Sequence, residues 1–95
     1  MVSHEYLPDI VIEQQDGTKI YVECKGGGRA FSHDVQRKMR EVRNQNNIDL
    51  RIIFFSDFKV GQKKKDGTFS KASDWAVKNR FKFHIGKNIP KDWLQ

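Results

Sequence analysis

Hydrophobic and polar residues alternate in two short stretches near the start of the chain, at residues 8–13 and 18–24, with Gln14-Gln15-Asp16-Gly17 between them. Both stretches are rich in β-branched and aromatic residues, so the pattern predicts a β-hairpin. Side chains alternate along a strand, which divides the second stretch into two faces. We expect the apolar face to be the core. The charged face carries Tyr21, Glu23 and Lys25, and the apolar face carries Ile20, Val22 and Cys24.

The length of the turn decides where Asp9 points. A two-residue Asp16-Gly17 turn pairs Asp9 with Cys24 and sends its carboxylate to the core face, whereas a three-residue turn, Gln15-Asp16-Gly17, pairs Asp9 with Glu23. Burial of an unpaired carboxylate costs on the order of several kcal/mol. We therefore expect the three-residue turn, which places the Cβ atoms of the two acids roughly 5 Å apart.

The rest of the chain predicts two helices and two more strands. Helical spacing of Val35, Met39 and Val42 indicates a helix over 34–46, capped by Ser32 or Asp34. The apolar run 50–55 is typical of a central strand buried on both faces. A second helix, about 73–80, is expected to be capped by Ser73-Asp74 and to bury Ala72, Trp75 and Ala76, and residues 81–85 alternate as a strand. The predicted fold is α+β, with a mixed sheet.

Composition narrows the function. Ninety-five residues make one small domain, 1–95. No apolar run approaches the roughly 20 residues of a membrane span, and the single cysteine fits a reducing compartment. No histidine and cysteine cluster has zinc spacing. The net charge of +6 favours a polyanionic partner. We expect neither a membrane partner nor a small-molecule cofactor.

The candidate metal-binding and catalytic residues lie on the predicted hairpin. Asp9 and Glu23 are oxygen ligands that can hold a hard divalent cation such as Mg²⁺ or Mn²⁺, and Lys25 beside them can assist water or phosphate chemistry. The alternative is a solvated hairpin face with ordinary charges. The three glycines 26–28 either let the backbone approach a bound strand or only make a turn. Candidates for phosphate contacts, which could equally be solvated surface charges, are Arg29, Lys59, Lys63, Lys64 and Lys65.

The order strand–strand–helix–strand–helix–strand, with Pro-Asp on the first strand and Glu-x-Lys on the second, resembles the PD-(D/E)xK superfamily of restriction-endonuclease-like nucleases. Further segments extend the resemblance from about residue 6 to the end of the chain, and make it specific to the bacteriophage endonuclease I family of junction-resolving enzymes. These segments are Tyr6-Leu7-Pro8-Asp9, Val22-Glu23-Cys24-Lys25-Gly26, the strand Asp49-Leu50-Arg51-Ile52-Ile53-Phe54, Lys82-Phe83 and Ile89-Pro90-Lys91-Asp92-Trp93.

The resemblance implies a Mg²⁺-dependent endonuclease, with Mn²⁺ as a substitute, that cuts phosphodiester bonds in branched DNA such as Holliday junctions. It implies an intertwined homodimer, working in the cytoplasm of a phage-infected or prophage-bearing bacterium. Asp9 and Glu23 would be catalytic metal ligands, Cys24 would supply a backbone carbonyl ligand, and Lys25 would be the catalytic lysine. Family members also carry an N-terminal helix with a further catalytic glutamate. Only seven residues precede Pro8 here, so we expect a core lacking that helix.

Three other interpretations stay open. The chain can be a DNA-binding module that needs a partner chain to complete its active site, which the unmatched N-terminal glutamate favours. It can be another nuclease of the same superfamily that trims ends or flaps. It can also be a structural protein in which the motif occurs by chance.

Overall fold

The two alternating stretches form the hairpin that their pattern predicts. The computed structural model describes residues 8–94, and in it β1 (Ile10–Glu13) pairs antiparallel with β2 (Lys19–Lys25). Ile10 lies opposite Val22 and Ile12 opposite Ile20, the register of a three-residue turn. Gly17 takes a positive φ of 88° and donates its N–H to the Gln14 carbonyl at 3.0 Å. The expected turn is confirmed.

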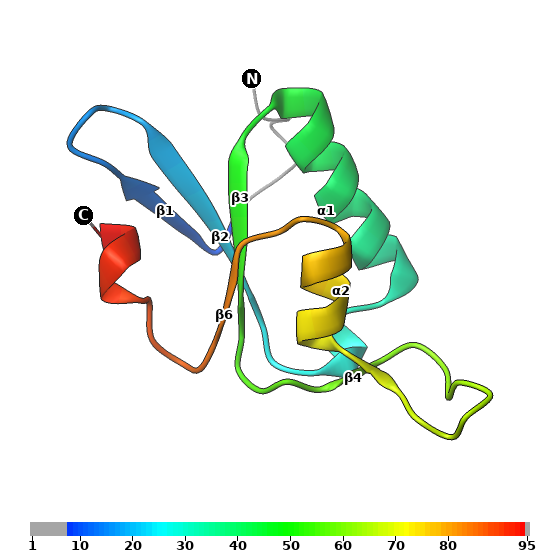
Figure 1. Cartoon of the computed structure of the whole chain (residues 1–95). Coiled ribbons are helices and arrows are strands. Elements are labelled where there is room, and N and C mark those ends of the chain that lie inside the picture. Colours follow the sequence, from blue (N-terminus) through cyan, green and yellow to red (C-terminus); the bar gives the residue numbers. More distant parts are fainter. Residues whose placement is uncertain (1–7, 95) are drawn as a thin grey trace.

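The sheet continues from the hairpin into two parallel pairings (Figure 1). Its strand order is β1-β2-β3-β6, with β3 (Asp49–Phe54) parallel to β2 and β6 (Phe83–Ile85) parallel to β3. Because β3 is internal and covered on both faces, its apolar run is almost wholly buried, as predicted. The predicted order of strands and helices and the α+β mixed sheet are confirmed.

Two helices cover one face of this sheet. The first, α1 (His33–Asn46), begins after Ser32, whose hydroxyl accepts a hydrogen bond from the Val35 N–H at 3.3 Å. The second, α2 (Ala72–Lys78), begins one residue earlier than expected. The Ser73 part of the predicted cap is wrong, because the Ser73 hydroxyl donates to Asp57 at 2.7 Å instead. Asp74 does cap the helix, accepting from the Lys71 N–H at 2.9 Å.

The helix-covered face holds the larger core, and it is mainly aromatic. Phe54 is fully buried, and its ring meets those of Phe31 and Phe58 edge-on at centroid distances of 5.5 and 5.6 Å. Trp75 stacks on Phe81 at 5.2 Å. The three predicted inward residues of α2, Ala72, Trp75 and Ala76, are buried here, and so is Met39 of α1.

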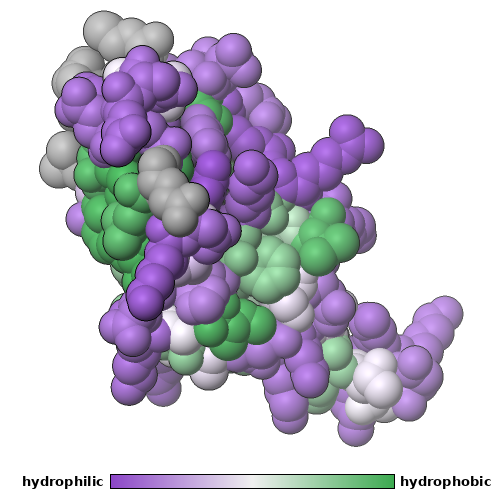
Figure 2. All heavy atoms as spheres, turned by 60° about the vertical axis from the view of Figure 1, so that its left-hand side comes forward, coloured by the Kyte–Doolittle hydropathy of each residue, from purple (hydrophilic) through white to green (hydrophobic). Residues whose placement is uncertain are grey.

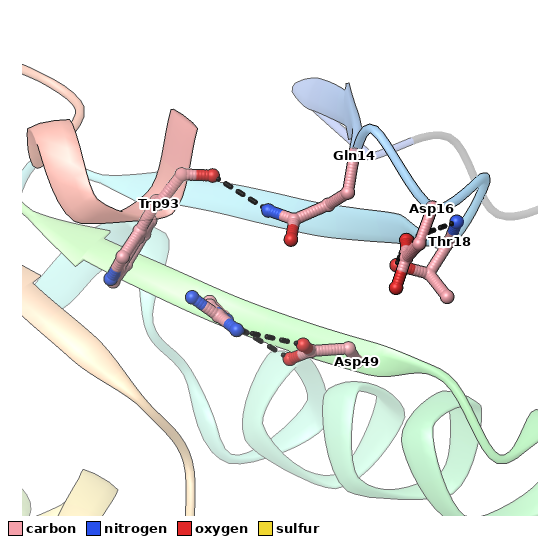
Figure 3. Close-up of polar contacts among 6 residues, drawn as sticks. Gln14, Asp16, Thr18, Asp49 and Trp93 are labelled. Atoms are coloured by element: carbon pink, nitrogen blue, oxygen red, sulfur yellow. Dashed lines mark hydrogen bonds and ion pairs between the residues drawn. The ribbon is translucent and has the colours of Figure 1, made fainter. Parts of the chain in front are cut away.

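A smaller cluster lies on the opposite face. It joins Ile12, Ile20, Val22 and Ile53 to Trp93 of the short 3-10 helix η2 (Lys91–Leu94), and Cys24 packs partly buried against it. Figure 3 shows how the Gln14 amide donates to the Trp93 carbonyl at 2.9 Å, so that the hairpin and η2 are joined directly. The expected core face of β2 is confirmed.

Sequence patterns did not predict the second hairpin, β4 (Lys59–Val60) with β5 (Ser70–Lys71), which projects from the body of the protein (Figure 1). Its turn repeats that of the first hairpin. In both, an aspartate carboxylate accepts from the N–H and hydroxyl of a threonine two residues later, at Asp16–Thr18 and Asp66–Thr68. Gly67 takes a φ of 90°, matching Gly17. The residues of its loop, 61–68, are all exposed.

Candidate active site

The hairpin and the neighbouring parallel strand bring the three predicted catalytic residues to one end of the sheet. Glu23 and Lys25 both project from β2 toward the helix-covered face, near the point where β2 ends beside the end of β3. The Lys25 ammonium lies 3.5 Å from a carboxylate oxygen of Glu23. Glu23 is only 7% exposed, so this ion pair is partly shielded from water.

Asp9 stands directly before β1, and continuing the register by one residue places it opposite Glu23. Hydrogen-bonded and non-hydrogen-bonded pairs alternate along an antiparallel ladder, and Gln14 with Thr18 is a bonded pair. Asp9 with Glu23 is therefore a non-bonded pair, in which opposing side chains lie closest. Asp9 is exposed, and its Oδ2 accepts a hydrogen bond from the Cys24 N–H at 2.8 Å. Its carboxylate does not enter the core, as the three-residue turn predicts.

The same alternation leaves the Cys24 carbonyl without a partner from β1. The N–H and C=O of one strand residue point to the same side, and the Cys24 N–H points toward Asp9. Continuing the register of β1 and β2 by two residues places Pro8 opposite Cys24, and proline has no N–H to donate. The Cys24 carbonyl therefore opens beside the Asp9 carboxylate as an acceptor that the ladder does not use.

The surroundings of Cys24 change the pKa of its thiol. Burial raises its pKa, the carboxylates of Asp9 and Glu23 raise it further, and the Lys25 ammonium opposes them. The thiol therefore stays protonated at neutral pH, which argues against a nucleophilic role for Cys24. The groups available for chemistry at this site are therefore oxygen donors and the Lys25 ammonium group.

The donor set suits a hard cation whose coordination is completed from outside the protein. Among residues 8–94, no group of three or more histidine, cysteine, aspartate or glutamate side chains is placed to hold a metal ion. Asp9, Glu23 and the Cys24 carbonyl offer only oxygen atoms, which Mg²⁺ and Mn²⁺ prefer. Mg²⁺ usually keeps several waters and takes substrate phosphate oxygens, so a partial set of protein ligands fits it.

The glycines after β2 shape the exit from the site. A Cβ on Gly26 would lie 3.3 Å from the Phe55 ring, and the Phe55 N–H donates to the Lys25 carbonyl at 3.0 Å. This close approach of Phe55 requires glycine or a shift of the ring. Gly28 begins the 3-10 turn η1 (Gly28–Ala30). The glycines therefore lead into a turn, and close approach of a bound strand to them stays a prediction.

The predicted phosphate contacts lie on two neighbouring segments. Arg29 is exposed on η1, and a Cβ on Gly28 would lie 3.6 Å from the Lys59 carbonyl, so η1 adjoins β4. The Lys59 ammonium lies 4.8 Å from the centroid of the Phe69 ring. Lys63, Lys64 and Lys65 occupy the projecting loop, all exposed. Hydrophilic residues also dominate the face drawn in Figure 2, where apolar surface is limited to separate patches.

Sequence reasoning missed a second basic group, formed by Arg40 and Arg43 of α1 with Arg80 after α2. The two α1 arginines were not among the basic residues expected to contact phosphate. Their spacing of three residues, which puts them on one side of a helix, was the available signal. The position of Arg80 beside them depends on how α2 packs.

A mixed sheet with helices on one face and an acidic pair on its first two strands is an α+β nuclease-like core. A family model described as phage endonuclease I matches residues 1–95. The chain belongs to the phage endonuclease I family and is an endonuclease, and the resemblance read from its motifs is confirmed. Among curated proteins, no sequence matches it.

One prediction falls outside these findings. The expected lack of an N-terminal helix concerns residues before Pro8, which lie outside the described residues. The longest helix in the described part of the chain, α1, has 14 residues, and none there has the length and apolar character to cross a membrane.

Proposed function

We propose that this endonuclease is metal-dependent and cuts phosphodiester bonds in DNA, with branched DNA such as four-way junctions as its preferred substrate. The observation that carries the proposal is the meeting of Asp9, Glu23 and Lys25 on adjoining strands, with the Cys24 carbonyl opening beside them. Asp9, Glu23 and that carbonyl would hold Mg²⁺, or Mn²⁺ in its place. When bound, the cation would polarise the scissile phosphate and lower the pKa of a water.

The residues of the chain then take different roles in the proposed reaction. The Asp9 carboxylate is oriented by the Cys24 N–H, so one of its oxygens is fixed while the other faces outward. Lys25 forms an ion pair with a Glu23 oxygen in the free protein and can turn its ammonium to the attacking water or to charge developing on the phosphate. Arg29, Lys59 and the exposed lysines 63–65 contribute sequence-independent contacts to the DNA backbone.

Replacing Asp9 by asparagine tests the assignment. Asparagine keeps an acceptor for the Cys24 N–H but loses the charge that a cation needs. We expect nicking of supercoiled plasmid in Mn²⁺ to fall by at least about 100-fold, since a metal-ligand contribution of several kcal/mol is at stake. DNA affinity in EDTA should change by less than about twofold. Asp92→Asn, an exposed acid on η2, is the matched control. Equal cleavage by wild type and Asp9→Asn would defeat the proposal.

Preference for branched DNA, a homodimer and action inside an infected or prophage-bearing bacterium are proposed from the family resemblance. Parallel assays on a cruciform plasmid, a flap and a linear duplex measure the substrate preference, and light scattering measures the mass. We expect fastest cleavage of the cruciform and twice the mass of one chain. Faster cleavage of the flap would assign the enzyme to end or flap processing.

A second candidate is a DNA-binding module completed by another chain. The shortage of acidic side chains around Asp9 and Glu23 within residues 8–94 favours it. On this reading, the purified chain binds DNA but does not nick plasmid in Mg²⁺ or Mn²⁺, and the same plasmid assay therefore separates the two candidates.

A further inference from the structure

Two guanidinium groups of α1 reach Asn79 at the end of α2, next to a third arginine in the chain. Arg43 donates to the backbone carbonyl of Asn79 at 2.6 Å, and Arg40 donates to the Asn79 side-chain oxygen at 3.3 Å. Arg80 follows Asn79 directly in the chain. The Arg43 guanidinium also lies 4.1 Å from the centroid of the Phe81 ring. We call Arg40, Arg43 and Arg80 the arginine cluster.

The positive charge of the arginine cluster is not balanced by acids in the described part of the chain. Within residues 8–94, no aspartate or glutamate forms an ion pair with any of its three members, whereas Arg37 on the same helix pairs with both Asp34 and Glu41. The pKa of Arg43 is lowered first by burial and then by the charges of Arg40 and Arg80. Arg40 and Arg43 are thus held, half-buried, by Asn79 and the Phe81 ring, while Arg80 is exposed beside them in the chain.

The backbone of Arg80 adds a second observation. Its φ is 61°, in the left-handed region that favours glycine, just after the end of α2. Glycine would take this position more easily than arginine. Arg80→Gly would therefore remove the guanidinium without adding backbone strain, which makes it a clean test of that side chain.

We propose that the arginine cluster binds backbone phosphates of the DNA substrate at a site separate from the cleavage site. Planar guanidinium forks match phosphate oxygens in pairs, and a bound phosphate would relieve the repulsion among the three arginines. The proposal rests on the proposed function in taking DNA as the ligand.

The location of the cluster fits a contact distant from the cut. Both helices run away from the β4–β5 hairpin (Figure 1). Arg80 and Phe81 lead into β6, which is separated from β2 by β3, so the cluster lies across the sheet from Glu23 and Lys25.

Two variants test the proposal by DNA affinity in EDTA, measured by fluorescence anisotropy between about 50 and 200 mM salt. Arg80→Gly removes one charge and the left-handed strain, and Arg40→Gln removes a charge from α1. We expect each to weaken binding about 3- to 10-fold and to reduce the slope of log affinity against log salt by about 1. We expect Arg80→Gly to keep or raise the melting temperature, which a merely structural role for Arg80 would not predict.

Arg37→Gln is the matched control, because it also removes an α1 arginine, but one already paired with acids. It should change affinity by less than about twofold. Arg80→Gly and Arg40→Gln binding DNA as tightly as Arg37→Gln, with an unchanged salt slope, would overturn the proposal. Since no cleavage is measured, failure here is distinguishable from failure of the Asp9 test.

Inorganic phosphate, compared with chloride at matched ionic strength, separates DNA from a free anion as the source of phosphate. We expect phosphate to raise the melting temperature of the wild type more than that of Arg80→Gly. If phosphate does so while the DNA affinities and salt slopes of the variants stay unchanged, the cluster binds free anions only and the DNA proposal is wrong.

Discussion

Pro8 offers a test of the Cys24 carbonyl as a metal ligand. Continuing the register of β1 and β2 by two residues places Pro8 opposite Cys24, where a residue with an N–H is expected to donate it to that carbonyl. Pro8→Ala supplies the missing donor without altering a charge or a carboxylate. We expect the ladder to gain one hydrogen bond and the metal to lose free access to one oxygen.

The magnitudes follow from that single bond. A net backbone hydrogen bond contributes about 0.5–1.5 kcal/mol. In Pro8→Ala this bond must be broken before the carbonyl can bind a cation, so the Kd for Mn²⁺ should rise by about 2- to 12-fold. The free energy of unfolding gains the same amount but loses about 0.4–1 kcal/mol, because alanine leaves the unfolded chain more flexible than proline does. The two terms nearly cancel, so stability should stay within about 1 kcal/mol of the wild type.

Calorimetric titration with Mn²⁺ measures the first quantity, and urea unfolding measures the second. Pro90→Ala is the matched control, since it carries the same change in chain flexibility at a position before η2, away from the site. It should leave the Kd for Mn²⁺ unchanged. If Pro8→Ala binds Mn²⁺ as tightly as Pro90→Ala does, the Cys24 carbonyl is not a ligand.

Two further predictions concern the core and the hairpin turns. Phe54→Ala should lower the free energy of unfolding by about 3–5 kcal/mol, because Phe54 is fully buried among aromatic rings. Phe54→Leu should lower it much less. Urea titration measures both losses, and equal losses would contradict the packing argument. Hydrogen bonds from Thr18 and Thr68 lower the pKa values of Asp16 and Asp66 from the ordinary 3.8. Both carboxylates therefore stabilise the fold above their unfolded pKa, and this stabilisation is lost as the pH falls through the lower folded pKa. Melting temperatures of the Asp16→Asn, Asp66→Asn double variant should therefore fall less than those of the wild type between about pH 5 and pH 2, and parallel curves would refute this.

The first hairpin could be predicted because two independent constraints agreed. A glycine at the end of the turn and the cost of burying the Asp9 carboxylate both required the same register, and that register alone placed Asp9 opposite Glu23. The second hairpin carries the same Asp-Gly-Thr turn at residues 66–68. It was missed because its strands are only two residues long, which is too short for alternation to be seen.

Other features depend on contacts that sequence patterns do not contain. Ser73 was expected to cap α2, but Asp57 from a preceding loop binds it instead. Gln36 is buried on α1 because its amide donates to the Phe31 carbonyl at 2.9 Å, a bond that no hydrophobic pattern predicts. The arginine cluster likewise arises only when α1 and α2 pack side by side.

The link between Gln14 and Trp93 joins residues 79 positions apart. The hairpin that carries Asp9 and Glu23 therefore has an uncovered rear face until η2 arrives, and during synthesis η2 leaves the ribosome after every other described element. Closing so long a loop is entropically costly and slow compared with forming the hairpin itself. A newly made chain thus passes through a stage in which the acidic pair is already in place while the rear face of the sheet is still exposed to water. The ability to cleave DNA should therefore be acquired last.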